Sequence, residues 1–312
     1  MHFIQHLGAL GALCAVLVSA RPPMPVGDKN TKNLRLVKTG PYHEGMWIEE
    51  EDKYTRMDLA TYGFIDITDI EDRAVLASLR GFQEPVRKHK YPRSMNFVYV
   101  TNNLINNVQM QFPKGYLKDL TDLQNRYYDG SSGSIATAYL MVIAGANYDS
   151  VGRTKDGAAP GADSNASGVV TILEALRVIA NSRLEPFNTL EFHFYSGKEG
   201  GLRGSADIFK KYKAEKQVVL GFLNVAMTGY APAKGPFIYL SDTDSHLNGF
   251  LSRVVYEYTD IQAQYATCYN MYGCSDHISA TSNGFPAAFV SGSSNPWTKL
   301  RNSPEDVSSQ LS

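Results

Sequence analysis

The chain has 312 residues, 43% of them hydrophobic, and a formal net charge of −1 at pH 7. This length and composition predict one globular domain with extensions, and they exclude a disordered or fibrous protein. A net charge near zero without a long basic block provides no general attraction for nucleic acids or anionic lipids. We therefore expect no nucleic-acid partner and no membrane association.

The first twenty residues have the pattern of a secretory signal peptide. An apolar run at Leu7–Val18 is followed by the small residues Ser19 and Ala20, as at a signal-peptidase site. The run is too short to span a bilayer, which argues against the alternative of a membrane anchor. We predict cleavage after Ala20 and a secreted, extracellular protein.

The segment 21–90 is polar and rich in charge. It contains the acidic run Glu49–Asp52 and ends at the basic run Arg87–Lys90. This pattern is typical of a pro-region that ends near a processing site, and an ordinary charged linker is the alternative. We predict a signal peptide at 1–20, a pro-region-like segment at 21–90 and the main domain at 91–312.

From about residue 118, apolar segments of strand length alternate with segments of helical periodicity. The predicted strands are Ala138–Ala146, Thr189–Tyr195, Val218–Met227, Pro236–Leu240 and Pro286–Val290. The predicted helices are Gly168–Ala180, Leu202–Lys213 and Ser245–Tyr258. This alternation predicts an α/β fold with a mixed, largely parallel twisted β-sheet sandwiched between helices.

Polar residues follow two of these strands, at the edge where the site of an open α/β sheet is expected. Asn147 and Asp149 follow the first predicted strand, and Lys198 and Glu199 follow the second. Ala226 stands at the corresponding end of the third. We expect the functional site at this edge of the sheet.

The cysteines and one sequon concern secretion. Cys14 would leave with the signal peptide, so Cys268 and Cys274 remain and are predicted to form a disulfide that fixes a local turn. Two free thiols are the alternative. Asn165 begins the chain's sole N-glycosylation sequon and is a possible glycan acceptor.

Several segments, in the same order, resemble the secreted, fungal-type leucine aminopeptidases of peptidase family M28. The matching segments are Leu120–Tyr128, Gly145–Ser150, Ala159–Gly168, Glu191–Ser196, Lys198–Ser205, Ala226–Tyr230 and Cys274–His277. The resemblance implies a zinc-dependent exopeptidase-like fold with an N-terminal pro-region. It also implies a domain shortened at its C-terminus, because family members carry a further helix there.

In that family two zinc ions are held by a His, an Asp that bridges both metals, a Glu, a second Asp and a final His, and a further Glu is the general base. The resemblance implies replacements at four positions: Asn147 for the first His, Ser164 for the bridging Asp, Lys198 for the base and Ala226 for the later Asp. An amide is a poor zinc ligand, and a neutral hydroxyl cannot share charge between two cations. The active site is therefore predicted to be degenerate.

Two ligand positions keep their residue type, Glu199 and His277. Two protein ligands fall below the three of a catalytic zinc site. A protonated Lys198 can neither take a proton from a metal-bound water nor accommodate a nearby dication. The alternatives without a metal are a salt bridge between Glu199 and Lys198, a local hydrogen bond of His277, and a charge cluster in which Asp163 and Asp276 join that pair.

We accordingly predict an inactive leucine aminopeptidase homologue with no catalytic residue, no intact metal site and no cofactor. The alternative is an active metallo-aminopeptidase that removes N-terminal residues with a rearranged or single metal site. Peptide amino termini in a remnant pocket are the candidate ligand of an inactive homologue, and no other partner is indicated. We expect a monomer.

Overall fold

The computed structural model describes most of the chain beyond the predicted signal peptide, which lies outside the described residues together with Cys268. The described residues are 22, 24, 33–40, 42–56, 59, 63–79, 90–123, 125–126, 144–152, 154, 156–182, 184, 186, 188–230, 237–241, 244–266, 274–292 and 301–311. Within these ranges no helix has the length and apolar character needed to cross a membrane.

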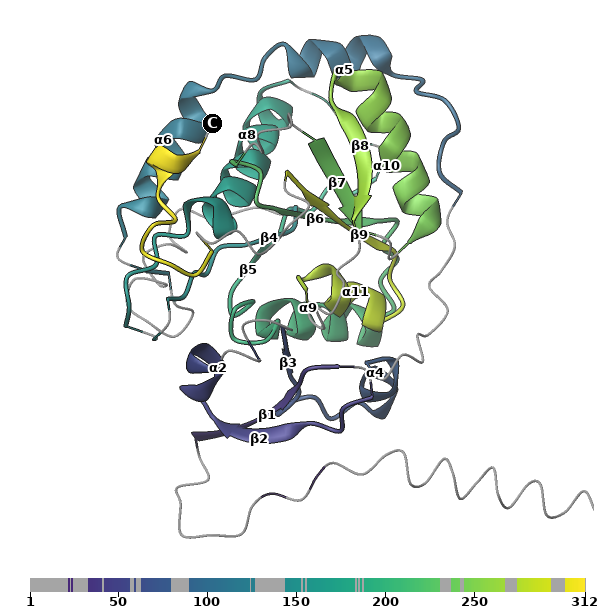
Figure 1. The fold of residues 1–312 in the computed structure, drawn as a ribbon. Helices are drawn as coiled ribbons and strands as arrows, with labels where there is room; N and C mark the ends of the chain where they lie inside the picture. The colour runs from purple at the N-terminus through teal and green to yellow at the C-terminus, as the bar shows by residue number, and fades with distance from the viewer. Residues whose placement is uncertain are drawn as a thin grey trace, which may run out of the picture.

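A mixed β-sheet forms the middle layer of the molecule (Figure 1). The larger sheet has the strand order β6-β9-β7-β8, with the bounds β6 (Phe222–Ala226), β9 (Ala287–Ser291), β7 (Phe237–Ser241) and β8 (Gln262–Ala266). The pairs β6–β9 and β7–β8 are parallel, whereas β7 and β9 are antiparallel. The predicted mixed, largely parallel sheet is confirmed.

Two short parallel strands extend this layer towards the candidate site. β4 (Ala146–Asn147) pairs with β5 (Phe194–Tyr195), and Gly145 bridges in parallel to Asn224 of β6. The carboxyl ends of β4, β5 and β6 therefore lie at one edge of the sheet. Of the predicted strand Ala138–Ala146, the structure describes only the last residues.

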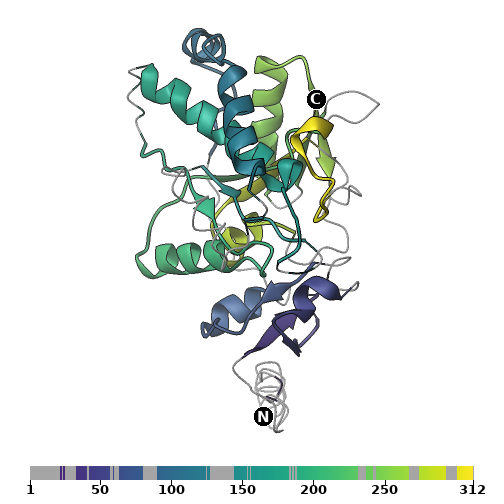
Figure 2. The same cartoon turned by 90° about the vertical axis from the view of Figure 1, so that its left-hand side faces the viewer.

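Helices cover both faces of the sheet, as Figures 1 and 2 show. On one face lie α6 (Gln111–Thr121), α8 (Gly168–Asn181) and α10 (Ser245–Tyr258), and on the other lie α9 (Arg203–Ala214) and α11 (His277–Ser282). The alternation of strand side chains explains this arrangement: in β6, Phe222 packs in the cluster with α9, and Val225 packs in the cluster with α8. The predicted sandwich is confirmed.

The segment 33–79 forms a small antiparallel sheet below α9 and α11 (Figures 1 and 2). Its strand order is β2-β1-β3, with the bounds β1 (Leu34–Lys38), β2 (Met46–Glu49) and β3 (Ile65–Asp66), and the helices α2 (Asp52–Thr55) and α4 (Arg73–Ser78) accompany it. A buried cluster joins Leu36 and Ile65 of this sheet to Leu202 at the start of α9. The small sheet thus shares a core with the main domain, and the predicted boundary at residue 90 remains a prediction.

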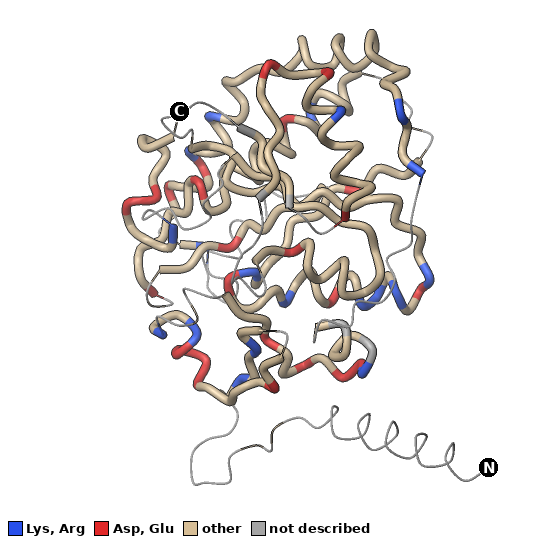
Figure 3. Tube along the Cα trace, turned by 45° about the vertical axis from the view of Figure 1, so that its right-hand side comes forward, with Lys and Arg blue, Asp and Glu red and all other residues tan. Residues whose placement is uncertain are grey.

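The remaining elements close the molecule at its far side and its C-terminus. α5 (Val98–Ile105) lies at the top of the molecule in Figure 1, above α10. The C-terminal turn η3 (Ser308–Gln310) lies beside α6. Charges of both signs are interspersed along the chain in Figure 3, in keeping with the near-zero net charge. Cys274 is disulfide-bonded. The pairing with Cys268 stays a prediction.

Candidate functional site

The loops that follow β4 and β5 are joined by a direct hydrogen bond. The backbone nitrogen of Glu199 donates to Oδ2 of Asp149 over 2.9 Å. Asn147, the last residue of β4, donates from Nδ2 to the backbone oxygen of Asp149 at 3.1 Å and to its Oδ1 at 3.3 Å. All three residues are buried. The residues expected at the strand ends are therefore brought together.

Asn165 links the ends of β4 and β6. It lies in η2 (Ala162–Ser167), and its Nδ2 donates to Oδ1 of Asn147 at 3.2 Å and to the backbone oxygen of Val225 at 3.1 Å. Its Oδ1 accepts from the backbone nitrogen of Met227 at 3.0 Å. This organising role was missed in the sequence, where Asn165 was noted only as part of a sequon.

The same contacts argue against glycosylation of Asn165. The nitrogen that would carry the glycan is engaged in hydrogen bonds, and the residue is 2% exposed. A glycan would have to displace these contacts and open the loop. The folded chain therefore does not present Asn165 as an acceptor, and this possible modification is not supported.

Lys198 and Glu199 form a buried ion pair in the loop after β5. Nζ of Lys198 contacts Oε1 of Glu199, and Nη2 of Arg301 lies 3.4 Å from the same carboxylate. Burial alone disfavours an ionised Glu199, but the two cations outweigh it and lower its pKa to about 2. Burial, with repulsion from Arg301, lowers the pKa of Lys198. The expected salt bridge is confirmed, and Arg301 is a partner that the sequence did not indicate.

Two further carboxyl groups lie in this buried region. Burial, followed by repulsion from Glu199, raises the pKa of Asp149 to about 6. Burial also raises the pKa of Asp276 to about 7, and the charges of Asp149 and Glu199 add to this rise. The interactions between these groups place Asp276 in the electrostatic environment of Lys198 and Glu199.

Asp163 does not join this cluster. Its Oδ1 accepts from the backbone nitrogens of Gly229 at 3.0 Å and Tyr230 at 3.2 Å, which belong to the loop after β6. Its own backbone nitrogen donates to Asp306 at 2.7 Å. The predicted cluster is thus wrong for Asp163, because its Oδ1 is bound by backbone donors of another loop and, among the described residues, it forms no ion pair with Lys198.

The other replaced positions have structural contacts. The backbone nitrogen of Ser164 donates to Oδ2 of Asp306 at 3.1 Å, and Ala226 ends β6 opposite Ser291 of β9. Asp306 caps this turn of η2 from the C-terminal segment, and no motif in the sequence indicated it. The assigned roles of Ser164 and Ala226 in a lost metal site stay predictions.

His277 begins α11 and is completely buried. Its ring lies 5.4 Å from the ring of Phe289, measured between centroids, and its two ring nitrogens have no hydrogen-bond partner among the described residues. Burial lowers its pKa to about 3, so the imidazole is neutral at neutral pH. The local hydrogen bond expected for His277 is not formed with any described residue.

Within the described part of the chain, the donor set does not fit the family's two-zinc arrangement. Among the described residues no group of three or more His, Cys, Asp or Glu side chains is placed to hold a metal ion. The Glu199 carboxylate is engaged by Lys198, and the Asn147 amide is engaged by its neighbours. The neutral imidazole of His277 is the one retained position whose donor atoms are unengaged by the described residues. We therefore derive no catalytic step through a metal.

Comparison with known proteins gives a consistent assignment. A family model described as "Peptidase family M28" matches residues 131–308. A probable leucine aminopeptidase from Arthroderma benhamiae is 32% identical over an alignment that covers 98% of this chain and 92% of the relative. A probable leucine aminopeptidase from Arthroderma otae is 33% identical, covering 90% of this chain and 85% of the relative.

Solved structures share the fold. The LapA aminopeptidase of Legionella pneumophila matches with a TM-score of 0.72 at 19% identity, covering 94% of this chain and 90% of that chain. LapB from the same organism matches with a TM-score of 0.65 at 21% identity, covering 87% and 81%. At these identities the likeness establishes the exopeptidase-like α/β architecture.

These comparisons correct two predictions. The prediction that the chain is not an enzyme is wrong, because relatives aligned over nearly the whole chain carry the name probable leucine aminopeptidase. The prediction of no cofactor is wrong as well, because the chain matches peptidase family M28, and the resemblance to that family implies zinc.

Proposed function

This chain belongs to peptidase family M28, and from that premise we propose that it is an aminopeptidase that removes N-terminal residues, leucine among them, from peptides. The observation that carries the proposal is the 32% identity to a probable leucine aminopeptidase across 98% of this chain. An alignment of that extent includes the strands and loops that build the site, and is not limited to a shared core.

The proposed activity also requires an account of its metal site. The family implies zinc, yet the described residues do not complete its two-metal arrangement. We propose that the activity uses a rearranged or single metal site. Glu199 and His277 are the two retained ligand types, and both are buried at the carboxyl edge of the sheet. Their contribution to binding and turnover is the first quantity to measure.

We further propose that the protein is secreted as a monomer, with a signal peptide at 1–20 and a pro-region-like segment at 21–90. The support is the apolar run before Ala20 and the basic run Arg87–Lys90. Mass spectrometry of the protein collected from the medium reads the mature N-terminus directly. A mature chain that begins before Ala20 would contradict the predicted cleavage, and one that begins after Lys90 would support the pro-region.

The test of activity uses the purified full chain. Zinc is measured by elemental analysis, and hydrolysis of a leucine anilide is followed with and without a chelator. We expect bound zinc and hydrolysis that the chelator abolishes. We expect this hydrolysis to be lost in Glu199→Gln and in His277→Ala. Each of these residues keeps one of the family's ligand types, which is why both substitutions are informative.

A variant with the family's residues restored is the matched control: Asn147→His, Ser164→Asp, Lys198→Glu and Ala226→Asp combined. It reports whether the fold and the assay support turnover once every ligand type is present. The proposal fails if this variant hydrolyses the anilide while the wild-type chain, under the same conditions and with added zinc, does not.

A further inference from the structure

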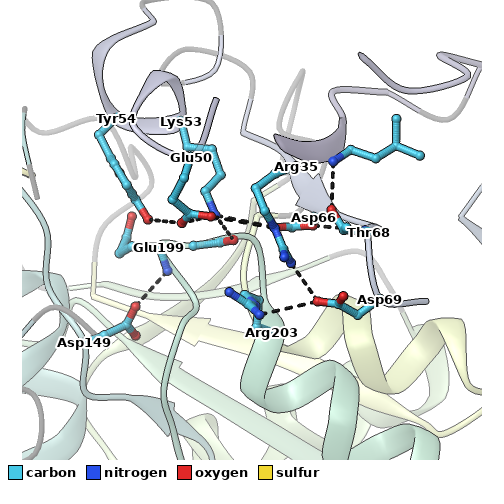
Figure 4. Close-up of polar contacts among 12 residues, drawn as sticks. Arg35, Glu50, Lys53, Tyr54, Asp66, Thr68, Asp69, Asp149, Glu199 and Arg203 are labelled. Atoms are coloured by element: carbon cyan, nitrogen blue, oxygen red, sulfur yellow. Dashed lines mark hydrogen bonds and ion pairs between the residues drawn. The ribbon is translucent and has the colours of Figure 1, made fainter. Parts of the chain in front are cut away.

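The small N-terminal sheet is fastened to the loop that carries Lys198 and Glu199. We call residues 198–202 the Lys198 loop. Nζ of Lys53 in α2 donates to the backbone oxygen of Gly200 over 3.3 Å. The backbone nitrogen of Asp66 in β3 donates to the backbone oxygen of Gly201, also over 3.3 Å. Figure 4 shows the contacts of Lys53 with Glu50 and Asp66 in the same view as Glu199 of the loop. These two contacts with the loop join residues that are 147 and 135 positions apart in the chain, and they lie next to the candidate site.

Lys53 is fully engaged by this contact. Its ammonium has three donor hydrogens, and three acceptors surround it: Glu50 at 2.6 Å, Asp66 at 3.4 Å and Gly200 at 3.3 Å. The side chains of Lys53 and Asp66 are completely buried. A buried ammonium needs such partners, and one of them is supplied by the backbone of the Lys198 loop.

The backbones of Gly201 and Asp66 lie so close together that a side chain at position 201 would collide with Asp66. A Cβ atom there would lie 2.5 Å from the nitrogen of Asp66 and 2.6 Å from its Cβ, and Gly201 has φ +102°, which other residues rarely adopt. Next to it, Leu202 belongs to the buried cluster of the small sheet, and Ile278, which follows His277, packs against the same cluster. Leu202, in the same loop as Glu199, and Ile278, which follows His277, therefore both pack against the N-terminal sheet.

We propose that Lys53 is a positioning residue of the candidate site in the chain that retains residues 33–79. Lys53 holds the carbonyl of Gly200, which follows Glu199 directly, and so limits the orientations open to the Glu199 carboxylate. This inference rests on the proposed aminopeptidase function for its catalytic consequence. Its structural consequence, an ordered Lys198 loop, stands without it.

The structural consequence is measured by hydrogen exchange of the loop in the full chain. The amides of Gly201 and Leu202 both donate to the backbone oxygen of Lys198, at 3.0 and 3.1 Å. In Lys53→Met, which keeps the length of the side chain without its charge, we expect these amides to exchange about tenfold faster, because a charge-assisted hydrogen bond to the loop is lost. Unchanged exchange would overturn the proposal.

Ile48→Ala is the matched control. Ile48 is buried with Val37 and Leu59 in a separate cluster of the small sheet, so its loss destabilises the same segment without touching the loop. We expect loop exchange to stay within about twofold of wild type in this variant. Equal acceleration in Ile48→Ala and Lys53→Met would mean that only the stability of the sheet matters, and would refute a specific role of Lys53.

A double variant guards against misfolding. Lys53→Met leaves Asp66 paired with Arg35 at 2.7 Å and with one cation fewer, so adding Asp66→Asn removes a buried negative charge while the contact to Gly200 stays absent. We expect a folded protein with the same fast loop. Wild-type exchange in the folded double variant would contradict the proposal.

Kinetics then separate the two levels of the inference. With active wild-type enzyme, we expect Lys53→Met to lower kcat for a leucine anilide about tenfold with KM within about twofold, while Ile48→Ala keeps kcat. An unchanged kcat alongside a fast loop would refute the catalytic consequence. If the wild type has no activity, the proposed function fails, and the exchange measurement still decides whether Lys53 orders the loop.

Discussion

Lys198 directs its ammonium against the carboxylate of the next residue, Glu199, and less than a tenth of either side chain is exposed. The resemblance to the family implies that the first position corresponds to the general base and the second to a metal ligand. Arg301 adds a second cation to the same carboxylate at 3.4 Å. The negative charge of Glu199 is thereby neutralised by Lys198 and Arg301.

Loss of Lys198 should therefore destabilise the fold. Among the described residues, Lys198→Met leaves the ionised Glu199 with Arg301 as its one cationic partner and Asn302 as a neutral donor at 3.5 Å. We expect the free energy of unfolding to fall by about 2–3 kcal/mol, less than for a buried pair with no second partner. Chemical denaturation at neutral pH measures it. Lys211→Met is the control, because Lys211 is exposed and its ion pair at 3.9 Å should be worth under about 0.5 kcal/mol. Equal effects would contradict this account.

Arg126 should be among the most sensitive residues of the domain. It is completely buried, and its guanidinium donates to the backbone oxygens of Tyr148 at 2.8 Å, Leu120 at 2.9 Å and Gly161 at 2.9 Å, and also to that of Pro160. Arg126→Met would remove the guanidinium donor from all four carbonyls, although that of Gly161 keeps another donor, the backbone nitrogen of Ala166 at 2.9 Å. We expect a loss of about 3–5 kcal/mol in urea denaturation.

A control separates this network from the loss of a single arginine. Arg253→Met removes one exposed hydrogen bond, to the backbone oxygen of Pro92 at 3.0 Å. We expect a change within about 0.5 kcal/mol there. If Arg126→Met lost no more than this, the carbonyl network would not be a stabilising feature.

Gly201→Ala should separate the small sheet from the Lys198 loop. The added Cβ meets Asp66 at 2.5 Å, and the residue keeps φ +102° only with strain. We expect a loss of about 2–3 kcal/mol, read from thermal unfolding. Gly115→Ala in α6 has no atom within 4 Å of the new Cβ and should instead stabilise by about 0.5–1 kcal/mol. A neutral effect at Gly201 would show that the interface adjusts freely.

Asp66 should give the fold an acid limit. Burial opposes its ionisation, but the charges of Lys53 and Arg35, with hydrogen bonds from Arg35 and Thr68, lower its pKa below 3.8. A group whose pKa is lower in the folded state stabilises the fold at pH values above its unfolded pKa, and this contribution is lost as the pH falls through the folded pKa.

We therefore expect the free energy of unfolding to decline as the pH falls below about 4, in part because of Asp66. Asp66→Asn lacks this titration, so its stability should be lower at pH 7 and should decline less steeply below pH 4. Urea denaturation at a series of pH values measures both slopes. Parallel curves for the two proteins would show that Asp66 does not contribute.

Local patterns in the sequence were sufficient for several elements. The helix predicted at Ser245–Tyr258 is α10 with the same bounds, because its apolar spacing and the N-cap of Asp244, which accepts from two backbone nitrogens at 2.9 Å, act within a few residues. The placement of Asn147 and Glu199 at strand ends followed likewise from strand periodicity. β8 was missed, because Gln262–Ala266 alternates with polar residues and lacks an apolar run.

Tertiary structure alone decided how the site is held. The burial of Asn165 between β4 and β6, the binding of Asp163 to the loop after β6, and the seating of Lys53 on Gly200 all join residues distant in the chain. No local spacing encodes such pairs, because they arise when the packing of helices and sheets brings remote backbone donors and acceptors together. The sequence thus determined the family and the fold class, whereas packing determined which partners the residues at the strand ends acquired.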